Sequence, residues 1–377
     1  MRHFGRAFLL LLCAGASPLS AQAVRGRLVD DQDRPVGAAF VILHDSAGTP
    51  ARRALSRADG RFLLAAPGPG VYTLRAERIG YGTAVSPPLR LAAGDTLDYR
   101  MRASGAAVTL EGITVSAGSR CDVRPAQGVA AAALWEEARK ALSVSAWAGE
   151  EDMVRVALVQ FRRQLDGQGK VVSEQLTGSE EGPSRTPFAS APAEQLARDG
   201  YRQVRRNETW YFAPDANTLL SDAFLDTHCF RAVVGRGAEE GLVGLAFAPA
   251  GRRSVPDVQG TLWIDRRTRE LRHLDYRYTR LPFVEDHRLV GGRVEFERLP
   301  NGAWIVDRWF IRMPLTRAPY RVGRNVGQPV LIGFVESGGE VREIRDAQGN
   351  HLRPPLPPAP AQAPPPEPAV STGPPPP

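Results

Sequence analysis

Residues that could bind a metal or move a proton are sparse in this chain, which has six histidines and three cysteines among 377 residues. The densest group is Asp222, Asp226, His228 and Cys229, and carboxylates, imidazoles and thiolates are all metal ligands. A structural role explains this group better. A disulfide-bonded cysteine cannot ligate a metal, and the two carboxylates suit the solvated end of a helix. The sequence therefore predicts no metal site.

A second group, Glu285, Asp286 and His287, follows Pro282 in a predicted loop. Histidine titrates near neutrality, so this loop could supply a general acid or base, although a solvated turn is the commoner explanation. The chain has no Gly-x-Ser-x-Gly elbow, no phosphate-binding glycine loop ahead of Lys and Ser or Thr, and no His-Glu-x-x-His pair. We therefore predict no catalytic residues and no cofactor, with a hydrolase as the least favoured alternative.

Short strands separated by turn-forming residues fill the first hundred positions. Asp59-Gly60 and Pro67-Gly68-Pro69-Gly70 are turn sequences, because glycine admits positive φ and proline presets φ. Between these turns the residues alternate with period two, so that Phe62 and Leu64 share one face of a strand. Strands of this kind bury one face against a second sheet, which indicates a β-sandwich.

With Phe40-Val41-Ile42-Leu43 and Gly80-Tyr81, these strands and turns resemble the carboxypeptidase regulatory-like domain. The resemblance covers about residues 24–103 and implies a transthyretin-like, seven-stranded β-sandwich, also found in front of TonB-dependent outer-membrane receptors. One departure is Asp33-Arg34-Pro35, where the family usually has glycine one residue before the proline. Zinc carboxypeptidases hold their metal with a His-x-x-Glu pair and a distant His, and no such pair occurs here. The regulatory module is therefore expected without the catalytic domain.

A helix and a long antiparallel meander are predicted after residue 120. Residues 125–142 have apolar side chains at helical spacing, with Glu136, Glu137, Arg139 and Lys140 on the opposite side. A second short helix is expected over residues 216–225. The predicted strands are residues 152–163, 169–176, 209–213, 241–247, 258–265, 270–280, 292–299, 303–313 and 329–336. This pattern predicts a curved antiparallel sheet or half-open barrel with one or two packed helices.

One hairpin of this meander, Trp263-Ile264-Asp265-Arg266-Arg267-Thr268, and the later Gly302-Ala303-Trp304 resemble the envelope lipoprotein-carrier superfamily. Members of that superfamily hold acyl chains in an apolar cavity. The resemblance therefore implies an alternative function, a periplasmic carrier of a lipid or other apolar ligand. The aromatic residues that would line such a cavity are Trp263, Tyr276, Tyr278, Phe296, Trp304 and Trp309. Packing in a protein core is the simpler account of these side chains.

The first 23 residues read as a secretion signal. Basic residues precede an apolar run from Ala7 to Ala16 that is too short to span a bilayer, and Ala21-Gln22-Ala23 supplies the small residues of a cleavage site. Lipid attachment at Cys13 is an alternative, but Leu12 stands where a lipobox has a small residue. The chain is therefore predicted to be exported to the periplasm or the outer-membrane surface.

Export also determines how the cysteines are interpreted. An even pair, Cys121 and Cys229, remains after cleavage, and an oxidising compartment favours a disulfide between them. The formal charge of +7 comes mostly from scattered arginines without a dense basic run, so we expect no nucleic-acid partner. No later segment is apolar and long enough to form a transmembrane helix, which leaves room for peripheral membrane association.

The sequence thus predicts a mainly β protein of several parts. These are a signal peptide (1–23), an N-terminal seven-stranded β-sandwich (24–104), a linker (105–119), a β-rich second domain (120–345) and a Pro-rich disordered tail (346–377). We expect a non-catalytic cell-envelope protein that binds or scaffolds a protein or a glycan.

Overall fold

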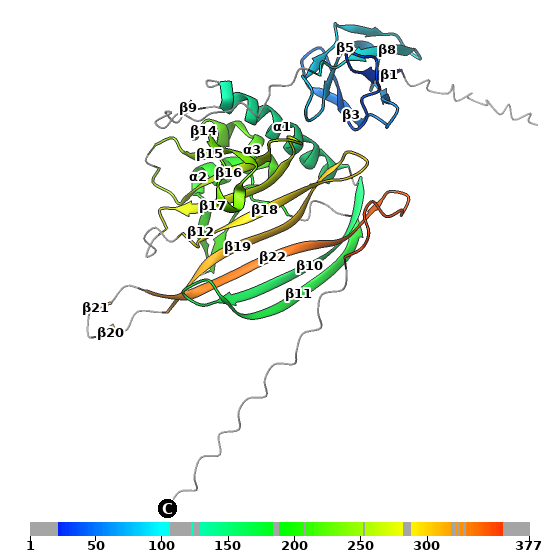
Figure 1. Cartoon of the computed structure of the whole chain (residues 1–377). Helices are drawn as coiled ribbons and strands as arrows, with labels where there is room; N and C mark the ends of the chain where they lie inside the picture. Colours follow the sequence, from blue (N-terminus) through cyan, green and yellow to red (C-terminus); the bar gives the residue numbers. More distant parts are fainter. Residues whose placement is uncertain are drawn as a thin grey trace, which may run out of the picture. The chain divides into compact units, whose positions relative to one another are not determined.

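The computed structural model describes residues 22–105, 122–123, 129–151, 153–183, 188–206, 208–251, 253–281, 288–317, 321–322, 325–326 and 329–356. The chain divides into two compact units, of which the first comprises residues up to Glu77 together with Thr83–Ser104, and the second the rest. Both consist mainly of antiparallel strands, which confirms the predicted fold class (Figure 1). No helix among the described residues is both long and apolar enough to cross a membrane.

The first unit is a sandwich of a three-stranded and a five-stranded sheet. The first sheet has the order β4 (Arg61–Ala65), β1 (Ala23–Val29), β8 (Thr96–Arg102). The second has the order β3 (Pro50–Leu55), β2 (Phe40–His44), β5 (Gly70–Glu77), β6 (Ala84–Val85), and β7 (Leu89–Leu91) also pairs with β5. Phe62 and Leu64 are buried on the shared face that the alternation predicts, whereas Leu63 between them is 62% exposed.

The first strand of the sandwich overlaps the predicted signal peptide. Ala23, the last residue of that predicted peptide, is the first residue of β1, and its backbone N–H donates to the Asp95 carbonyl at 2.8 Å. The Gln22 side chain is buried and donates through Nε2 to the Ala66 carbonyl at 2.9 Å. Cleavage after Ala23 would therefore remove residues that pair within the sandwich.

The second unit is organised around a ten-stranded antiparallel sheet with a long helix against it (Figure 1). Its strand order is β11 (Val171–Pro183), β10 (Val154–Leu165), β22 (Val330–Asp346), β19 (Trp304–Arg317), β18 (Gly291–Arg298), β17 (Leu271–Thr279), β16 (Asp257–Asp265), β15 (Leu242–Pro249), β14 (His228–Val234), β9 (Asp122–Val123). Helix α1 (Val129–Glu150) is longer than predicted. The curved antiparallel sheet with packed helices agrees with the prediction.

Shorter elements complete the second unit. Two hairpins are formed by β12 (Arg202–Arg205) with β13 (Glu208–Tyr211) and by β20 (Arg321–Val322) with β21 (Asn325–Val326). The remaining helices are α2 (Ala193–Asp199), α3 (Ala216–Leu220), α4 (Asp222–Leu225) and the 3-10 turn η3 (Gly237–Glu239). The predicted helix over residues 216–225 is split at Ser221, whose hydroxyl accepts a hydrogen bond from the Phe224 N–H at 3.1 Å. Strand β14 and helix α2 were not predicted.

A row of apolar side chains crosses five neighbouring strands on the side of the sheet that faces α1. In register, Leu245 pairs with Leu262, then Leu274, Val294 and Trp309, and all five are buried. Phe247 shares this side with Leu245, since strand side chains alternate, and its cross-strand partner Phe230 contacts Trp135 of α1. The core of the second unit therefore lies between α1 and this side of the sheet.

Two of the four charged residues on the predicted polar side of α1 are not exposed. Glu137 and Lys140 are buried, and Lys140 Nζ lies 2.7 Å from Glu137 Oε1 one helical turn away. Glu137 also accepts from the Gly80 N–H at 2.9 Å, and Lys140 donates to the Tyr81 carbonyl at 2.8 Å, within the same unit. Burial is tolerated because each charge has an opposite charge and a backbone partner.

The beginning of the predicted Pro-rich tail is attached to the sheet. The guanidinium of Arg353 pairs with Glu297 and lies 2.7 Å from Asp307 Oδ1, and the Leu356 N–H donates to the Arg342 carbonyl at 2.9 Å. The rest of this tail, from residue 357, and nearly all of the predicted linker lie outside the described residues.

Candidate functional site

The side of the sheet opposite α1 carries a polar row beside the apolar one. The residues next in sequence to the buried apolar row are also paired across β15 to β19. They are Ala246, Thr261, Asp275, Arg293 and Phe310. These side chains point away from α1, because successive residues of a strand face opposite sides. Polar groups positioned by rigid, hydrogen-bonded strands make this face the place to look for a site.

A hollow of about 390 Å³ opens on this face. Its base carries the small residues Ala246, Ala248 and Gly291, which leave space among longer neighbours. The backbone allows no larger residue at position 291, because a Cβ there would lie 2.0 Å from the Tyr276 carbonyl oxygen. Small residues thus create the hollow, and the sheet fixes its shape.

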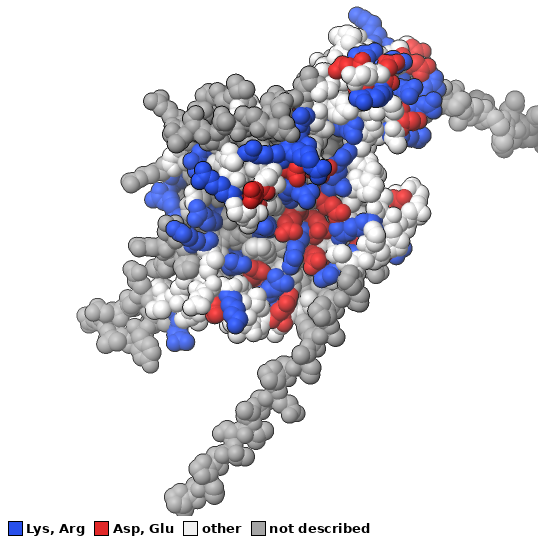
Figure 2. Space-filling view, viewed as in Figure 1, with Lys and Arg blue, Asp and Glu red and all other residues white. Residues whose placement is uncertain are grey.

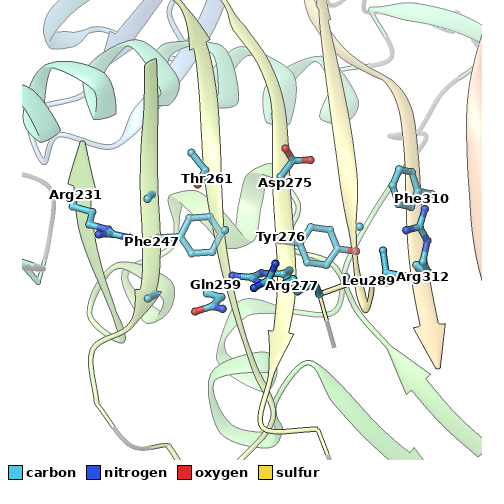
Figure 3. Close-up of a pocket in the computed structure, with 16 residues that line it drawn as sticks. Arg231, Phe247, Gln259, Thr261, Asp275, Tyr276, Arg277, Leu289, Phe310 and Arg312 are labelled. Carbon is cyan, nitrogen blue, oxygen red and sulfur yellow. The ribbon is translucent and has the colours of Figure 1, made fainter. Parts of the chain in front are cut away.

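Four arginines line this hollow: Arg231, Arg277, Arg288 and Arg312. Figure 3 shows Arg231 at one end of the row, Arg312 at the other and Arg277 between them. Asp275 is the only carboxylate among the described lining residues. The hollow is therefore strongly positive.

The four arginines differ in their ion pairing. Arg312 donates to Glu336 Oε2 from Nε at 3.0 Å and from a terminal nitrogen at 2.8 Å. Arg231, Arg277 and Arg288 are exposed, and no carboxylate of the described residues forms an ion pair with them. On the face of the second unit shown in Figure 2, acidic residues lie among the basic ones. Three positive charges that pair with no described carboxylate thus line the hollow.

A group of four ionisable residues adjoins the hollow. His273 Nε2 lies 3.2 Å from Glu239 Oε2 and 3.4 Å from Asp275 Oδ2, and these three side chains are close enough to hold a metal ion. The Arg293 guanidinium, however, lies 2.6 Å from Asp275 Oδ1 and 3.1 Å from Glu239 Oε1. A fixed positive charge already occupies the position between these carboxylates, so the group is an ion-pair cluster.

The pKa of Asp275 reflects this environment. Burial acts to raise it, but the neighbouring His273 and the Arg293 guanidinium outweigh burial, and the pKa of Asp275 is lowered from its ordinary value. Asp275 therefore stays ionised and neutralised by Arg293, and it offsets little of the charge of the other arginines.

The metal-ligand candidates from the sequence are not brought together. His228 is buried and stacks on Phe224 with ring centroids 4.0 Å apart, while Asp222 and Asp226 are exposed. The one group of potential metal ligands within the described part of the chain does not include them. Residues 285–287 lie outside the described residues.

The predicted disulfide falls partly outside the described residues. Cys229 is buried, but Cys121 is not described, and no disulfide joins two described cysteines. Residues 122–123 pair with β14, with Val123 opposite Cys229. The pairing of Cys121 with Cys229 stays a prediction.

The six aromatic residues that would line a carrier cavity occupy different places. Tyr276, Tyr278, Phe296, Trp304 and Trp309 are buried on the sheet, while Trp263 is only half-buried and pairs across the strands with His273. Of the six, only Tyr276 lines the hollow, and Phe296 with Trp304 lines a separate polar depression. Burial also raises the pKa of Tyr276 far above its ordinary value. A ligand-lining role for the six stays a prediction.

The sandwich presents its own charged surface. On the outer side of its three-stranded sheet, Arg27 of β1 is flanked in register by Arg61 of β4 and Arg100 of β8. In the next row Arg25 forms an ion pair with Asp98 at 2.6 Å. A shallow groove of about 580 Å³ runs over these residues. Fixed strands thus display a row of three guanidinium groups to solvent.

The sequence of this sandwich matches a known protein family. Residues 23–120 match the family model of the carboxypeptidase regulatory-like domain. The first unit is a carboxypeptidase regulatory-like domain. This confirms the resemblance found in the sequence, while the resemblance of the second domain to lipoprotein carriers stays a prediction. A comparison with curated proteins gave no match.

Solved structures resemble the chain only distantly. A 3-chlorocatechol 1,2-dioxygenase from Rhodococcus opacus is 13% identical over 22% of this chain and 59% of its own, with a TM-score of 0.18. A streptococcal ancillary pilin is 10% identical over 66% and 60%, with a TM-score of 0.20. The major pilin subunit of Bacillus cereus is 6% identical over 84% and 95%, with a TM-score of 0.19. The match spans less than two thirds of the dioxygenase, and such TM-scores establish no shared overall fold.

Proposed function

We propose that this protein is a non-catalytic, exported component of the cell envelope, whose regulatory-like sandwich binds or scaffolds a protein or a glycan. The observation that carries this proposal is the match of residues 23–120 to the carboxypeptidase regulatory-like domain. The chain lacks the His-x-x-Glu pair of the zinc carboxypeptidases, which supports a binding role for the module.

The arginine row on the outer side of the sandwich is the proposed contact surface. Arg27 has a backbone carbonyl, that of Asp59, as its hydrogen-bond partner at 3.3 Å, and Arg61 is 3.6 Å from the Asp59 carboxylate. Both guanidinium groups are weakly held and exposed, so they can bind acidic or hydroxyl-rich groups of an envelope polymer or protein.

Co-sedimentation of the full exported chain with isolated envelopes of the producing cells tests the proposal. We expect binding that weakens in Arg27→Gln/Arg61→Gln and persists in the control Arg52→Gln/Arg90→Gln, which removes two exposed arginines elsewhere on the sandwich. Envelopes treated with protease or with a glycan hydrolase distinguish the two partner classes. Failure to sediment with any envelope preparation would refute the binding function.

Two further measurements test the non-catalytic part of the proposal and its rival. A peptidase assay with and without a metal chelator should show no turnover, and chelator-sensitive hydrolysis would overturn the assignment. Native mass spectrometry of protein from its own envelope should show no acyl species. Co-purifying lipid would favour the carrier function instead.

Export and the disulfide are tested on the same material. The mass of the exported protein gives its N-terminus, and we propose the predicted cut after Ala23. Alkylation of the unreduced, denatured chain should add no label if Cys121 and Cys229 are joined, whereas two labels would disprove the bond. An unprocessed chain recovered only from the cytoplasm would contradict export.

A further inference from the structure

The arginine-lined hollow of the second unit has no role in the function proposed above, which rests on the sandwich. We propose that this hollow binds an anionic sugar, that is, a saccharide carrying a phosphate or carboxylate group. The inference is independent of the sandwich, because every residue that carries it belongs to the sheet of the second unit or to the loop before β18.

The positive charge of the hollow favours binding of an anion. Arg231, Arg277 and Arg288 have no ion-pair partner within the described residues, and Arg312 shares Glu336 with Arg163. Guanidinium groups spaced along one hollow leave positive charge there that an anionic ligand can neutralise. Their planar forks bind phosphate and carboxylate oxygens in pairs, with charge-assisted hydrogen bonds.

The size and remaining lining of the hollow favour a sugar over a bare ion. A volume of about 390 Å³ is far larger than one phosphate needs and falls within the range of small-molecule sites. Gln259 and Thr261 add an amide and a hydroxyl, which can exchange hydrogen bonds with sugar hydroxyls. Phe310 and Leu289 supply apolar edges for the ring carbons.

The hollow is also built to persist without a ligand. Its base consists of backbone and small side chains from adjacent strands, and the arginines project from β14, β17 and β19 and from residue 288 before β18 (Figure 3). Because paired strands fix the backbone positions of these residues, only the exposed arginine side chains need ordering when a ligand binds.

Isothermal titration calorimetry on the full exported chain tests the proposal with glucose 6-phosphate, glucuronate, glucose and inorganic phosphate as probes. We expect at least one of the two anionic sugars to bind, and to bind more tightly than glucose and than inorganic phosphate. Its affinity should fall as salt is added. Equal binding of glucose and the anionic sugars would overturn the role of the charge. Equal binding of inorganic phosphate would overturn the role of the sugar.

Matched variants locate the binding. The double variant Arg231→Gln/Arg277→Gln should lower the affinity for the anionic sugar by at least about tenfold, the effect of losing one charge-assisted hydrogen bond. The control Arg155→Gln/Arg162→Gln removes two exposed arginines of β10, outside the hollow, and should bind as the natural protein does. Ala248→Leu fills the base without changing charge and should also weaken binding. No binding by the natural protein, or equal binding by the two double variants, would disprove the proposal.

Discussion

Glu336 is the buried carboxylate that pairs with Arg312, the arginine at one end of the hollow. Glu336→Gln is the most informative single change in the second unit. The residue is 3% exposed and lies on β22 between two arginines. Arg163 donates to Oε1 at 3.1 Å, while Arg312 donates to Oε2 at 3.0 and 2.8 Å. The substitution keeps the shape of the side chain and removes its charge.

The expected cost follows from what remains after the change. Removing one partner from a buried ion pair costs about 3–5 kcal/mol, because the remaining charge is left desolvated. Here the two arginine side chains are 21% and 20% exposed, and Arg163 keeps a second partner, Glu174, at 2.9 Å. Partial exposure and this second pair reduce the loss, so we expect about 2–3 kcal/mol.

Glu174→Gln is the matched control, because it removes a carboxylate that pairs with the same Arg163. The Glu174 side chain is 44% exposed, and exposed pairs contribute about 0–1 kcal/mol. Urea unfolding at pH 7 measures both variants. All six tryptophans of the chain lie after residue 120, so tryptophan fluorescence follows the second unit alone. If Glu336→Gln costs no more than Glu174→Gln, burial does not strengthen this pair, and the reasoning fails.

The remaining predictions concern acid stability and close packing. The lowered pKa of Asp275 stabilises the folded state above the ordinary carboxyl value of 3.8, and this contribution is lost as pH falls through the folded value. Asp275→Asn should therefore flatten the acid side of the fluorescence-detected stability profile, and an unchanged profile would contradict the coupling to Arg293. In the sandwich, Gly26→Ala should cost about 1–3 kcal/mol by overpacking, because a Cβ there would lie 2.0 Å from Phe62 Cζ. Calorimetry should show a lower transition for the first unit only, while the control Gly68→Ala, with nothing within 4 Å, should change little.

Sequence periodicity was enough to predict the sandwich and the antiparallel sheet, because alternation reports which side of a strand is buried. Phe62 and Leu64 are an example, since both are buried on the predicted face. Prediction from periodicity failed where tertiary contacts override the local pattern. Glu137 and Lys140 lie on the charged side of α1 by spacing, yet both are buried, because each finds an opposite charge and a backbone group.

The arginine-lined hollow could not be predicted in the same way, because its residues are far apart in the sequence and meet only through register. Arg231 and Arg277 stand on strands separated by two others, β15 and β16. Alternation alone places each of them on an exposed face of a strand. An ordinary solvated surface arginine has the same pattern, so the sequence does not distinguish the two. Only the pairing of strands β14 to β19 brings these separate arginines to the same hollow.

The same register separates two roles of one sheet. Strands β15 to β18 each contribute a Leu or Val to the side covered by α1 and, one position away, a small or polar residue to the other side. Packing against α1 constrains the first set, whereas the exposed members of the second set can vary in charge without cost to the core. The second set combines small residues at the base with guanidinium groups that form no ion pair with a described residue, and the fold does not require this combination. Arg312 has the buried partner Glu336, whereas Arg231, Arg277 and Arg288 have no carboxylate partner in the described part of the chain, and this difference leaves their charge available to an anionic ligand.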